Sequence, residues 1–398
     1  MIRAWRSAGS DRIALVTEGE WIVATDVAEA PDGAEIIAVE GVILPAIIDL
    51  GVFAVDQAAC RAGGIVRVGL MPDQSPVLDD PGIIQRAAYM GKPHLWIHPI
   101  AAATRGLAGV ELAEMAIARD AGARAVATGR GWIGDSGVMR RVLAYARDCG
   151  LTVITHGEDG GLAGAGVATE GETATRLGLP AAPANAEALA IARDLILTEE
   201  TGARLHVRQV TTTAGFELIR RAKARGVAVT CGITPAHFLL SDIAMSDFRT
   251  FAHLSPPLRS EADRQAALAA VADGTVDVIC SGHDPRGPEE KRLPFADASP
   301  GMSGAETLLA LSLTLVRDGI VTLERLSVLL ATNPAGILGL DAGTLAPGKP
   351  ADFMVLDVDT PWQIDADRFV ARAGNTPFDK LPVQGKVRRL FKGGAEIL

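Results

Sequence analysis

The sequence predicts a (β/α)8 barrel, because short apolar runs alternate with amphipathic segments over most of the chain. The runs are rich in Val and Ile and nearly continuous in apolarity, which is typical of parallel strands covered on both faces. Glycine accounts for 43 of 398 residues and aromatic residues for only 4%, a composition that suits close packing of helices on a sheet. An open, doubly wound sheet is the alternative, and the even spacing of eight strand–helix units favours the barrel.

The predicted strands lie between residues 42 and 281 and are bounded by polar or turn-forming residues. They are Val42–Leu50, Ile65–Met71, His94–Ile100, Arg124–Thr128, Leu151–Gly157, Arg204–Val210, Val227–Ile233 and Asp277–Ser281.

Helical periodicity is clearest in four segments between these strands. They are Val110–Ala121, Val138–Cys149, Ala186–Thr201 and Ala214–Arg225. We expect Asn185 and Thr213 to cap the N-termini of the last two helices, and Gly202 and Gly226 to end them.

The two ends of the chain are β-like and rich in turns. Residues 1–41 contain short alternations such as Trp21–Ala24, and residues 343–398 contain the segments Gly343–Asp357 and Val387–Gly393. We expect residues 1–41 and 343–398 to form one small composite β-sandwich domain and residues 42–342 to form the barrel. The Gly/Ala-rich stretch Gly160–Ala184 follows the fifth predicted strand, and we interpret it as a loop on the active-site face.

Composition narrows the class of protein. The formal charge of −10 and the absence of Lys/Arg blocks argue against a nucleic-acid surface. The N-terminal residues lack the apolar core of a signal peptide, and no run of about twenty apolar residues indicates a membrane span. The four cysteines are scattered, as expected for buried, reduced thiols. We therefore expect a cytoplasmic protein.

Several segments carry motifs in a fixed order: Met71–Pro76, Gly171–Gly202, Ser255–Arg259, Gly343–Asp357, Asn375–Phe378 and Gly385–Val387. On these segments the sequence resembles the dihydroorotases, a family of the amidohydrolase superfamily, over nearly the whole chain. The resemblance implies a barrel of the metal-dependent hydrolase type. It also implies hydrolysis of a cyclic amide by a hydroxide that one or two zinc ions generate at the carboxyl ends of the strands.

The positions that match the family's metal ligands are mostly not ligands in this sequence. A His-x-His pair falls on Gly51 and Phe53, another histidine falls on Gln209, and the catalytic aspartate falls on Gly282. Only His156 matches a metal-binding histidine, and one ligand is too few for tight zinc binding. The resemblance therefore predicts a chain that keeps the scaffold without confident catalytic residues.

Other polar residues near the predicted strand ends leave alternatives open. His237, His283 and Asp284 could form a relocated metal site, although each is also compatible with a structural role. Arg130 stands in the segment that matches a bridging acidic or carboxylated lysine ligand, and Arg286 at the position of a substrate-contacting histidine. Together with Asp73 and the Gly301 loop, these arginines could bind an anion or could form local salt bridges.

Three functions follow from these patterns. The one we favour is an inactive dihydroorotase-like subunit, without cofactor, that assembles with aspartate carbamoyltransferase or with itself in pyrimidine biosynthesis. The second is an active amidohydrolase with a remodelled zinc site built on His156, His237, His283 and Asp284. The third is a metal-free binder of a small anion, such as an anionic pyrimidine precursor.

Overall fold

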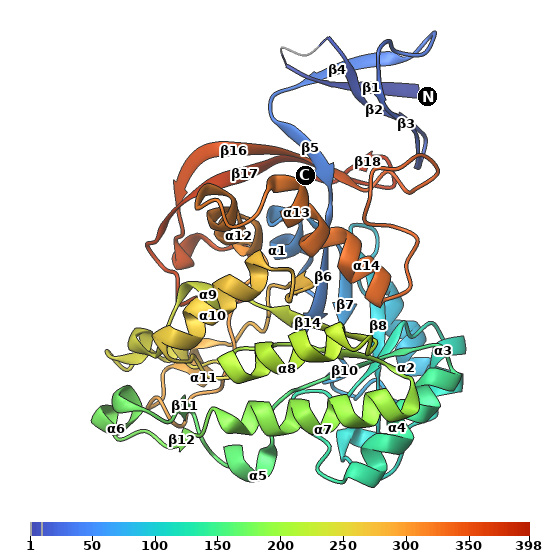
Figure 1. The fold of residues 1–398 in the computed structure, drawn as a ribbon. Helices are drawn as coiled ribbons and strands as arrows, with labels where there is room; N and C mark the ends of the chain where they lie inside the picture. Colours follow the sequence, from blue (N-terminus) through green and yellow to red (C-terminus); the bar gives the residue numbers. More distant parts are fainter. Residues whose placement is uncertain (1, 9–10) are drawn as a thin grey trace.

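The structure is a computed structural model that describes residues 2–8 and 11–398. A barrel with surrounding helices makes up most of the molecule, and strands from the two ends of the chain lie at one end of it (Figure 1). Among the described residues, every helix is too short or too polar to span a membrane.

Eight parallel strands form the barrel, in the order β15-β14-β13-β10-β9-β8-β7-β6. They are β6 (Ile47–Val52), β7 (Ile65–Leu70), β8 (Trp96–Ala102), β9 (Ala125–Ala127), β10 (Thr152–Thr155), β13 (Arg204–Val207), β14 (Val229–Ile233) and β15 (Val278–Ile279). The predicted fold class is confirmed, and each predicted apolar run overlaps one of these strands, although β6 and β8 each end two residues later than predicted.

The first predicted strand needs a correction. Val42–Leu50 is two strands, because β5 (Val42–Pro45) pairs antiparallel with β16 (Phe353–Gln363) and the barrel strand β6 begins only at Ile47. The run reads as continuous in sequence because both strands are apolar, although only Ile43 of β5 is buried, towards the terminal sheets, whereas all of β6 is buried.

Strands β6 and β15 lie at the two edges of the barrel ladder, and side-chain contacts join them. The carboxylate of Asp49 on β6 is fully buried and accepts a hydrogen bond from the Ser281 backbone N–H at 2.9 Å and another from the Ser281 hydroxyl. The backbone N–H of Phe53 donates to the carbonyl of His283 at 3.0 Å. These contacts close the seam of the barrel.

The outer helices largely follow the predicted positions. The longer ones are α2 (Pro81–Tyr89), α4 (Ser136–Asp148), α7 (Asn185–Thr201), α8 (Thr213–Ala224), α10 (Glu261–Ala272) and α12 (Leu308–Arg317). The shorter ones are α1 (Gln57–Ala62), α9 (Pro235–Leu239), α11 (Pro288–Lys291), α13 (Leu323–Ser327), the π-helical turn η4 (Val328–Thr332) and α14 (Asn333–Ile337).

Two predicted helix caps are wrong by one residue. Helix α7 already includes Asn185, and the residue before it makes no side-chain cap. The cap of α8 is Thr212, whose hydroxyl accepts from the backbone N–H of Gly215, so Thr213 is the first helical residue. Gly202 ends α7 with φ of 68°, and Gly226, just after α8, has φ of 83°, as expected for terminal glycines.

The first half of the helix predicted at Val110–Ala121 is absent. Only α3 (Met115–Asp120) is helical, because the preceding residues run extended and pair with the segment after β8. Leu112 forms an antiparallel bridge with Thr104, and the Arg105 N–H donates to the carbonyl of Glu111 at 2.9 Å. This local pairing outweighs the helical periodicity of the segment.

Gly160–Ala184 is an ordered excursion after β10 and not a plain loop. It contains α5 (Gly160–Ala163), α6 (Glu172–Leu177) and the two-stranded sheet of β11 (Ala168–Thr169) and β12 (Ala181–Ala182). The Thr169 hydroxyl ties it to the carbonyl of Leu258 at 3.0 Å.

Two four-stranded sheets come from the ends of the chain (Figure 1). The first has the order β3-β2-β1-β4, and the second has the order β18-β17-β16-β5 and so combines C-terminal strands with β5. Their bounds are β1 Ile2–Ser7, β2 Ile13–Glu18, β3 Trp21–Val27, β4 Glu35–Val39, β17 Pro382–Lys392 and β18 Ala395–Glu396. Trp5, Phe353 and Phe391 pack together between the sheets, with ring centroids 4.3–5.1 Å apart.

One turn outside the terminal sheets has the Gly-x-Gly-x-x-Gly spacing of dinucleotide sites, at Gly129–Gly134 between β9 and α4. The carboxylate of Asp135 caps α4 by accepting from the Val138 N–H at 2.7 Å. A negative charge therefore stands at the helix N-terminus where a pyrophosphate would need to bind, so the spacing does not make a nucleotide site here.

Candidate functional site

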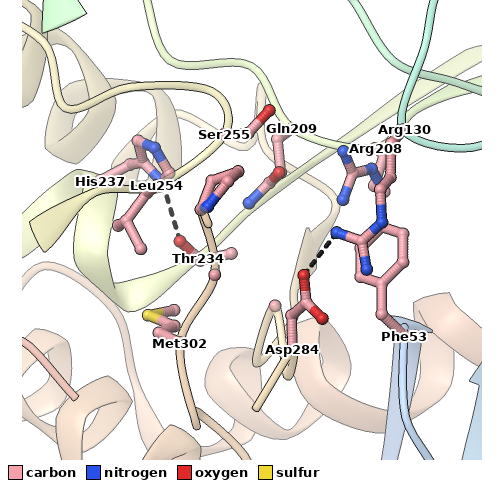
Figure 2. Close-up of a pocket in the computed structure, with 13 residues that line it drawn as sticks. Phe53, Arg130, Arg208, Gln209, Thr234, His237, Leu254, Ser255, Asp284 and Met302 are labelled. Carbon is pink, nitrogen blue, oxygen red and sulfur yellow. Dashed lines mark hydrogen bonds and ion pairs between the residues drawn. The ribbon is translucent and has the colours of Figure 1, made fainter. Parts of the chain in front are cut away.

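A cavity of about 110 Å³ lies at the carboxyl ends of the barrel strands (Figure 2). It is small beside the roughly 300–1,000 Å³ typical of ligand pockets. Its lining residues follow β6, β9, β13, β14 and β15 or come from the loops above them. They are Phe53, Arg130, Arg208, Gln209, Thr234, His237, Leu254, Ser255, Gly282, Asp284, Pro300, Gly301 and Met302.

Gly51 and Phe53, the two candidate positions at the end of the first barrel strand, both lie next to Arg208. Gly51 sits at an irregularity of β6 with φ of 90°, and a Cβ there would lie 3.4 Å from Cδ of Arg208. The Phe53 ring is contacted by two guanidinium groups, with Arg130 at 3.9 Å and Arg208 at 4.9 Å from its centroid. The space that Gly51 leaves open is thus bounded by the methylene chain of Arg208.

His156 follows β10 and is a buried link between charged groups. Its Nδ1 lies 3.1 Å from Nη2 of Arg208, and its Nε2 lies 3.5 Å from Oε2 of Glu158. Because a guanidinium can only donate, Nδ1 accepts, and Nε2 carries the proton that faces Glu158. Both ring nitrogens are engaged, so the lone pair that would bind a metal is directed at Arg208.

Gln209 and Gly282 are the other two positions that the family resemblance matches to metal-site residues. Gln209 lines the cavity, and its Oε1 has no hydrogen-bond partner among the described residues. Gly282 has φ of 59°, and a Cβ there would lie 3.0 Å from Cγ2 of Thr234. Neither position presents a charged or imidazole ligand.

The residues predicted to bind an anion lie close together, and most of them form ion pairs or hydrogen bonds with one another. Asp284 pairs with Arg130 and, at 3.0 Å, with Nη2 of Arg286. Asp73 accepts from the backbone N–H of Arg130 at 2.9 Å. Arg286 also binds Glu290 at 2.9 Å and lies outside the cavity lining, whereas Gly301 contributes to it.

The remaining histidine candidates have structural roles in this arrangement. His237 contacts the Thr234 hydroxyl through Nδ1 at 2.8 Å and the Pro256 carbonyl through Nε2 at 3.0 Å, and burial lowers its pKa to about 4. His283 is fully buried outside the cavity lining, and burial lowers its pKa to about 4 as well. The structure does not bring His156, His237, His283 and Asp284 together as one ligand set.

Arg208 is the site residue that sequence reasoning missed. Its side chain is 5% exposed, burial lowers the pKa of its guanidinium, and its Nε has no hydrogen-bond partner within the described part of the chain. The sequence does contain a signal for Arg208. It is a charged residue inside the apolar run Arg204–Val210, and a strand covered on both faces is not expected to carry a charge there.

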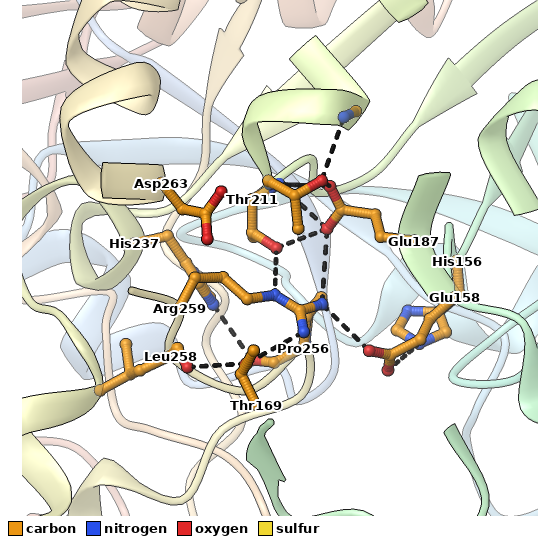
Figure 3. A network of polar contacts seen from close by, with 12 residues as sticks. His156, Glu158, Thr169, Glu187, Thr211, His237, Pro256, Leu258, Arg259 and Asp263 are labelled. Carbon is orange, nitrogen blue, oxygen red and sulfur yellow. Dashed lines mark hydrogen bonds and ion pairs between the residues drawn. The ribbon is translucent and has the colours of Figure 1, made fainter. Parts of the chain in front are cut away.

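A buried ionic network lies beside the cavity (Figure 3). The sequence did not predict this network either. Arg259 donates to Glu158 at 3.0 Å and lies 3.6 Å from Glu187, which in turn accepts from the backbone N–H groups of Thr211 and Thr212. Burial raises the pKa of Glu158, but the hydrogen bond with His156 and the charge of Arg259 outweigh it and bring the pKa to about 2. The network links the segments that follow β10 and β13.

These residues do not fit a zinc ion, which the fold family would imply. Structural and catalytic zinc sites use three or four Cys, His or carboxylate ligands. Within residues 2–8 and 11–398, no three such side chains gather into a group that could hold a metal. The cavity instead presents two guanidinium groups, which would repel a divalent cation.

Comparisons with known proteins agree with this architecture. The amidohydrolase family model matches residues 105–397. The chain is 40% identical to a protein named dihydroorotase from Geobacter metallireducens, covering 92% of this chain and 90% of that protein. It is also 40% identical to one of the same name from Pelotomaculum thermopropionicum, with 92% and 89% covered.

Solved structures show the same fold. An L-hydantoinase from Arthrobacter aurescens superposes with a TM-score of 0.87 at 23% identity, covering 100% of this chain and 95% of that one. A dihydropyrimidinase from Brevibacillus agri superposes with a TM-score of 0.84 at 20% identity and the same coverage. At these identities the likeness concerns the fold alone.

Proposed function

The chain belongs to the dihydroorotase family of the amidohydrolase superfamily, and from that premise we propose that it is a non-catalytic member. In this proposal the barrel serves pyrimidine biosynthesis as a structural or regulatory partner of aspartate carbamoyltransferase. It acts through its surface and not through hydrolysis of dihydroorotate.

One observation supports the proposed lack of catalysis most directly: Arg208 lies among the positions that the family resemblance matches to metal ligands. It contacts Phe53, bonds His156 and packs beside Gly51. A zinc-bound hydroxide requires several ligands around one cation, and here a guanidinium already engages the surviving histidine. The positive charge of Arg208 opposes the entry of a second cation.

An active enzyme with a remodelled site is the competing function. It would require His237, His283 and Asp284 to join His156 around a metal. His237 uses both ring nitrogens for Thr234 and Pro256, and Asp284 is held by Arg130 and Arg286. These contacts favour the non-catalytic function.

An assay of the purified protein tests the catalytic part of the proposal. Dihydroorotate hydrolysis and carbamoyl aspartate cyclisation are measured with and without added zinc, with the Geobacter metallireducens dihydroorotase as positive control. We expect no turnover above background in either direction. Turnover that disappears with the His156→Ala substitution would establish the remodelled enzyme instead.

The partnership with aspartate carbamoyltransferase rests on the family resemblance and on the retained barrel. Co-expression with the transferase of the same organism, followed by size-exclusion chromatography, tests it. We expect the two chains to elute together. Separate elution would contradict the partnership, and a homo-oligomer without the transferase would support self-association in its place.

A further inference from the structure

We infer that the cavity at the barrel mouth binds a small monocarboxylate, with the guanidinium of Arg208 as the group that holds it. This inference deepens the proposed function and rests on it in one respect, because the cavity must be free of a metal ion. The carboxylate would lie beside the guanidinium of Arg208, a residue that is not part of the family's metal-ligand pattern.

Arg208 is buried and has an unused donor. Its Nη2 is bound to His156 at 3.1 Å, whereas its Nε is without a hydrogen-bond partner among residues 2–8 and 11–398. An unsatisfied donor on a buried cation is costly, and a carboxylate is the ligand that a guanidinium satisfies best. No Asp or Glu of the described chain lies within ion-pair distance of Arg208.

The charge of the lining residues favours a monoanion. The charge of Arg130 is compensated by Asp284 and Asp73. Asp284 is also bound by Arg286. Arg208 has no such partner in the described chain, so one carboxylate from a ligand would compensate its charge.

Gln209 and the cavity size narrow the ligand further. The Oε1 of Gln209 is buried without a donor in the described structure, so a ligand with a hydroxyl or N–H group next to its carboxylate would satisfy it. The volume of about 110 Å³ suits a molecule of a few carbon atoms. Leu254 and Met302 offer an apolar wall for a short alkyl group. A short 2-hydroxy acid has this chemistry.

Calorimetric titration and thermal unfolding of the full chain test the inference. The probes are glycolate, L-lactate, acetate, phosphate and chloride at equal ionic strength. We expect glycolate or lactate to bind and to raise the unfolding temperature, acetate to bind at least tenfold more weakly, and chloride and phosphate to have no such effect. Absence of binding by both hydroxy acids, or equal binding of phosphate, would overturn the inference.

Two substitutions separate the site from general stability. Arg208→Gln should weaken hydroxy-acid binding at least tenfold. Gln209→Glu should abolish binding and raise the unfolding temperature of the ligand-free protein, because a carboxylate then neutralises Arg208 permanently. Gln85→Glu, exposed on α2, is the matched control and should change neither property.

The Gln209→Glu variant keeps the test decisive if Arg208→Gln does not fold. A lower unfolding temperature for Gln209→Glu, or unchanged hydroxy-acid binding in either variant, would contradict the role of Arg208. Metal content is measured on the same samples. Lack of binding in zinc-free protein would refute this inference alone, whereas stoichiometric zinc with turnover of dihydroorotate would refute the proposed function.

Discussion

At the scale of single residues, the departures from the family's metal-ligand pattern accompany one buried arginine, Arg208. Gly51 leaves room for the side chain of Arg208, and Arg208 then takes up the Nδ1 lone pair of His156. The sequence alone identified Gly51, Phe53, Gln209 and Gly282 as departures from the family pattern. It could not identify Arg208 as the neighbour of Gly51 and Phe53, because those contacts join segments that follow different strands.

Gly51 is expected to resist any side chain. Its φ of 90° is strained for other residues, and a Cβ would be in van der Waals contact with Cδ of Arg208 at 3.4 Å. We predict that Gly51→Ala lowers the free energy of unfolding by about 1–3 kcal/mol, measured by urea denaturation. Gly336→Ala, in the exposed and open turn of α14, should instead be neutral or stabilising. Equal stability of the two variants would show that Gly51 is not required by its backbone.

Asp49 is expected to make stability depend on pH. Burial raises its pKa to about 6, against the hydrogen bonds from Ser281, so the folded state keeps the proton to higher pH than the unfolded state. As pH rises from about 4 to 6, the unfolded carboxyl ionises first, and folding loses stability by roughly 2–3 kcal/mol.

The Asp49→Asn variant lacks this titration and serves as the reference. We predict that the native protein loses stability relative to Asp49→Asn between pH 4 and 6.5 in urea denaturation. Parallel stability curves for the two proteins would contradict a buried, titrating carboxyl at the β6–β15 seam.

At the scale of elements, periodicity predicted the strands better than the helix ends. The apolar runs located each barrel strand, because a covered parallel strand has an unmistakable composition. The predicted caps at Asn185 and Thr213 are each one residue off. Thr212 and Thr213 are equivalent in sequence, so either could cap α8, and α7 begins after Ala184 without a side-chain cap. The false helical start at Val110 had no local signal, because extended pairing with Thr104 and Arg105 decides it.

The Arg259 network is expected to hold the elements around the cavity. Arg259 compensates Glu158 and Glu187, both buried, so its removal leaves uncompensated charge. We predict that Arg259→Gln lowers the free energy of unfolding by about 3–5 kcal/mol in urea denaturation. Arg220→Gln, which breaks a half-exposed pair with Asp273, should cost much less.

A double substitution distinguishes charge compensation from simple packing. Glu158→Gln in the Arg259→Gln background should recover part of the lost stability, because it removes one of the two stranded carboxylates. If the two losses simply add, Arg259 stabilises the fold through packing and not through its charge.

At the scale of the whole molecule, the barrel and the family followed from the sequence, whereas the state of the site depended on three-dimensional contacts. The order of motifs along the chain predicted the dihydroorotase family, which the relatives at 40% identity confirm. The scaffold persists around a cavity where arginines and Phe53 lie at or beside the positions that the family resemblance matches to metal ligands. We therefore propose, as the central point, that this barrel does not perform zinc-dependent hydrolysis.

The most direct test measures zinc content and dihydroorotate turnover on one preparation of the purified protein after incubation with excess zinc and removal of unbound metal. We predict zinc far below one equivalent and no turnover in either direction. Zinc near one equivalent together with turnover of dihydroorotate would contradict it.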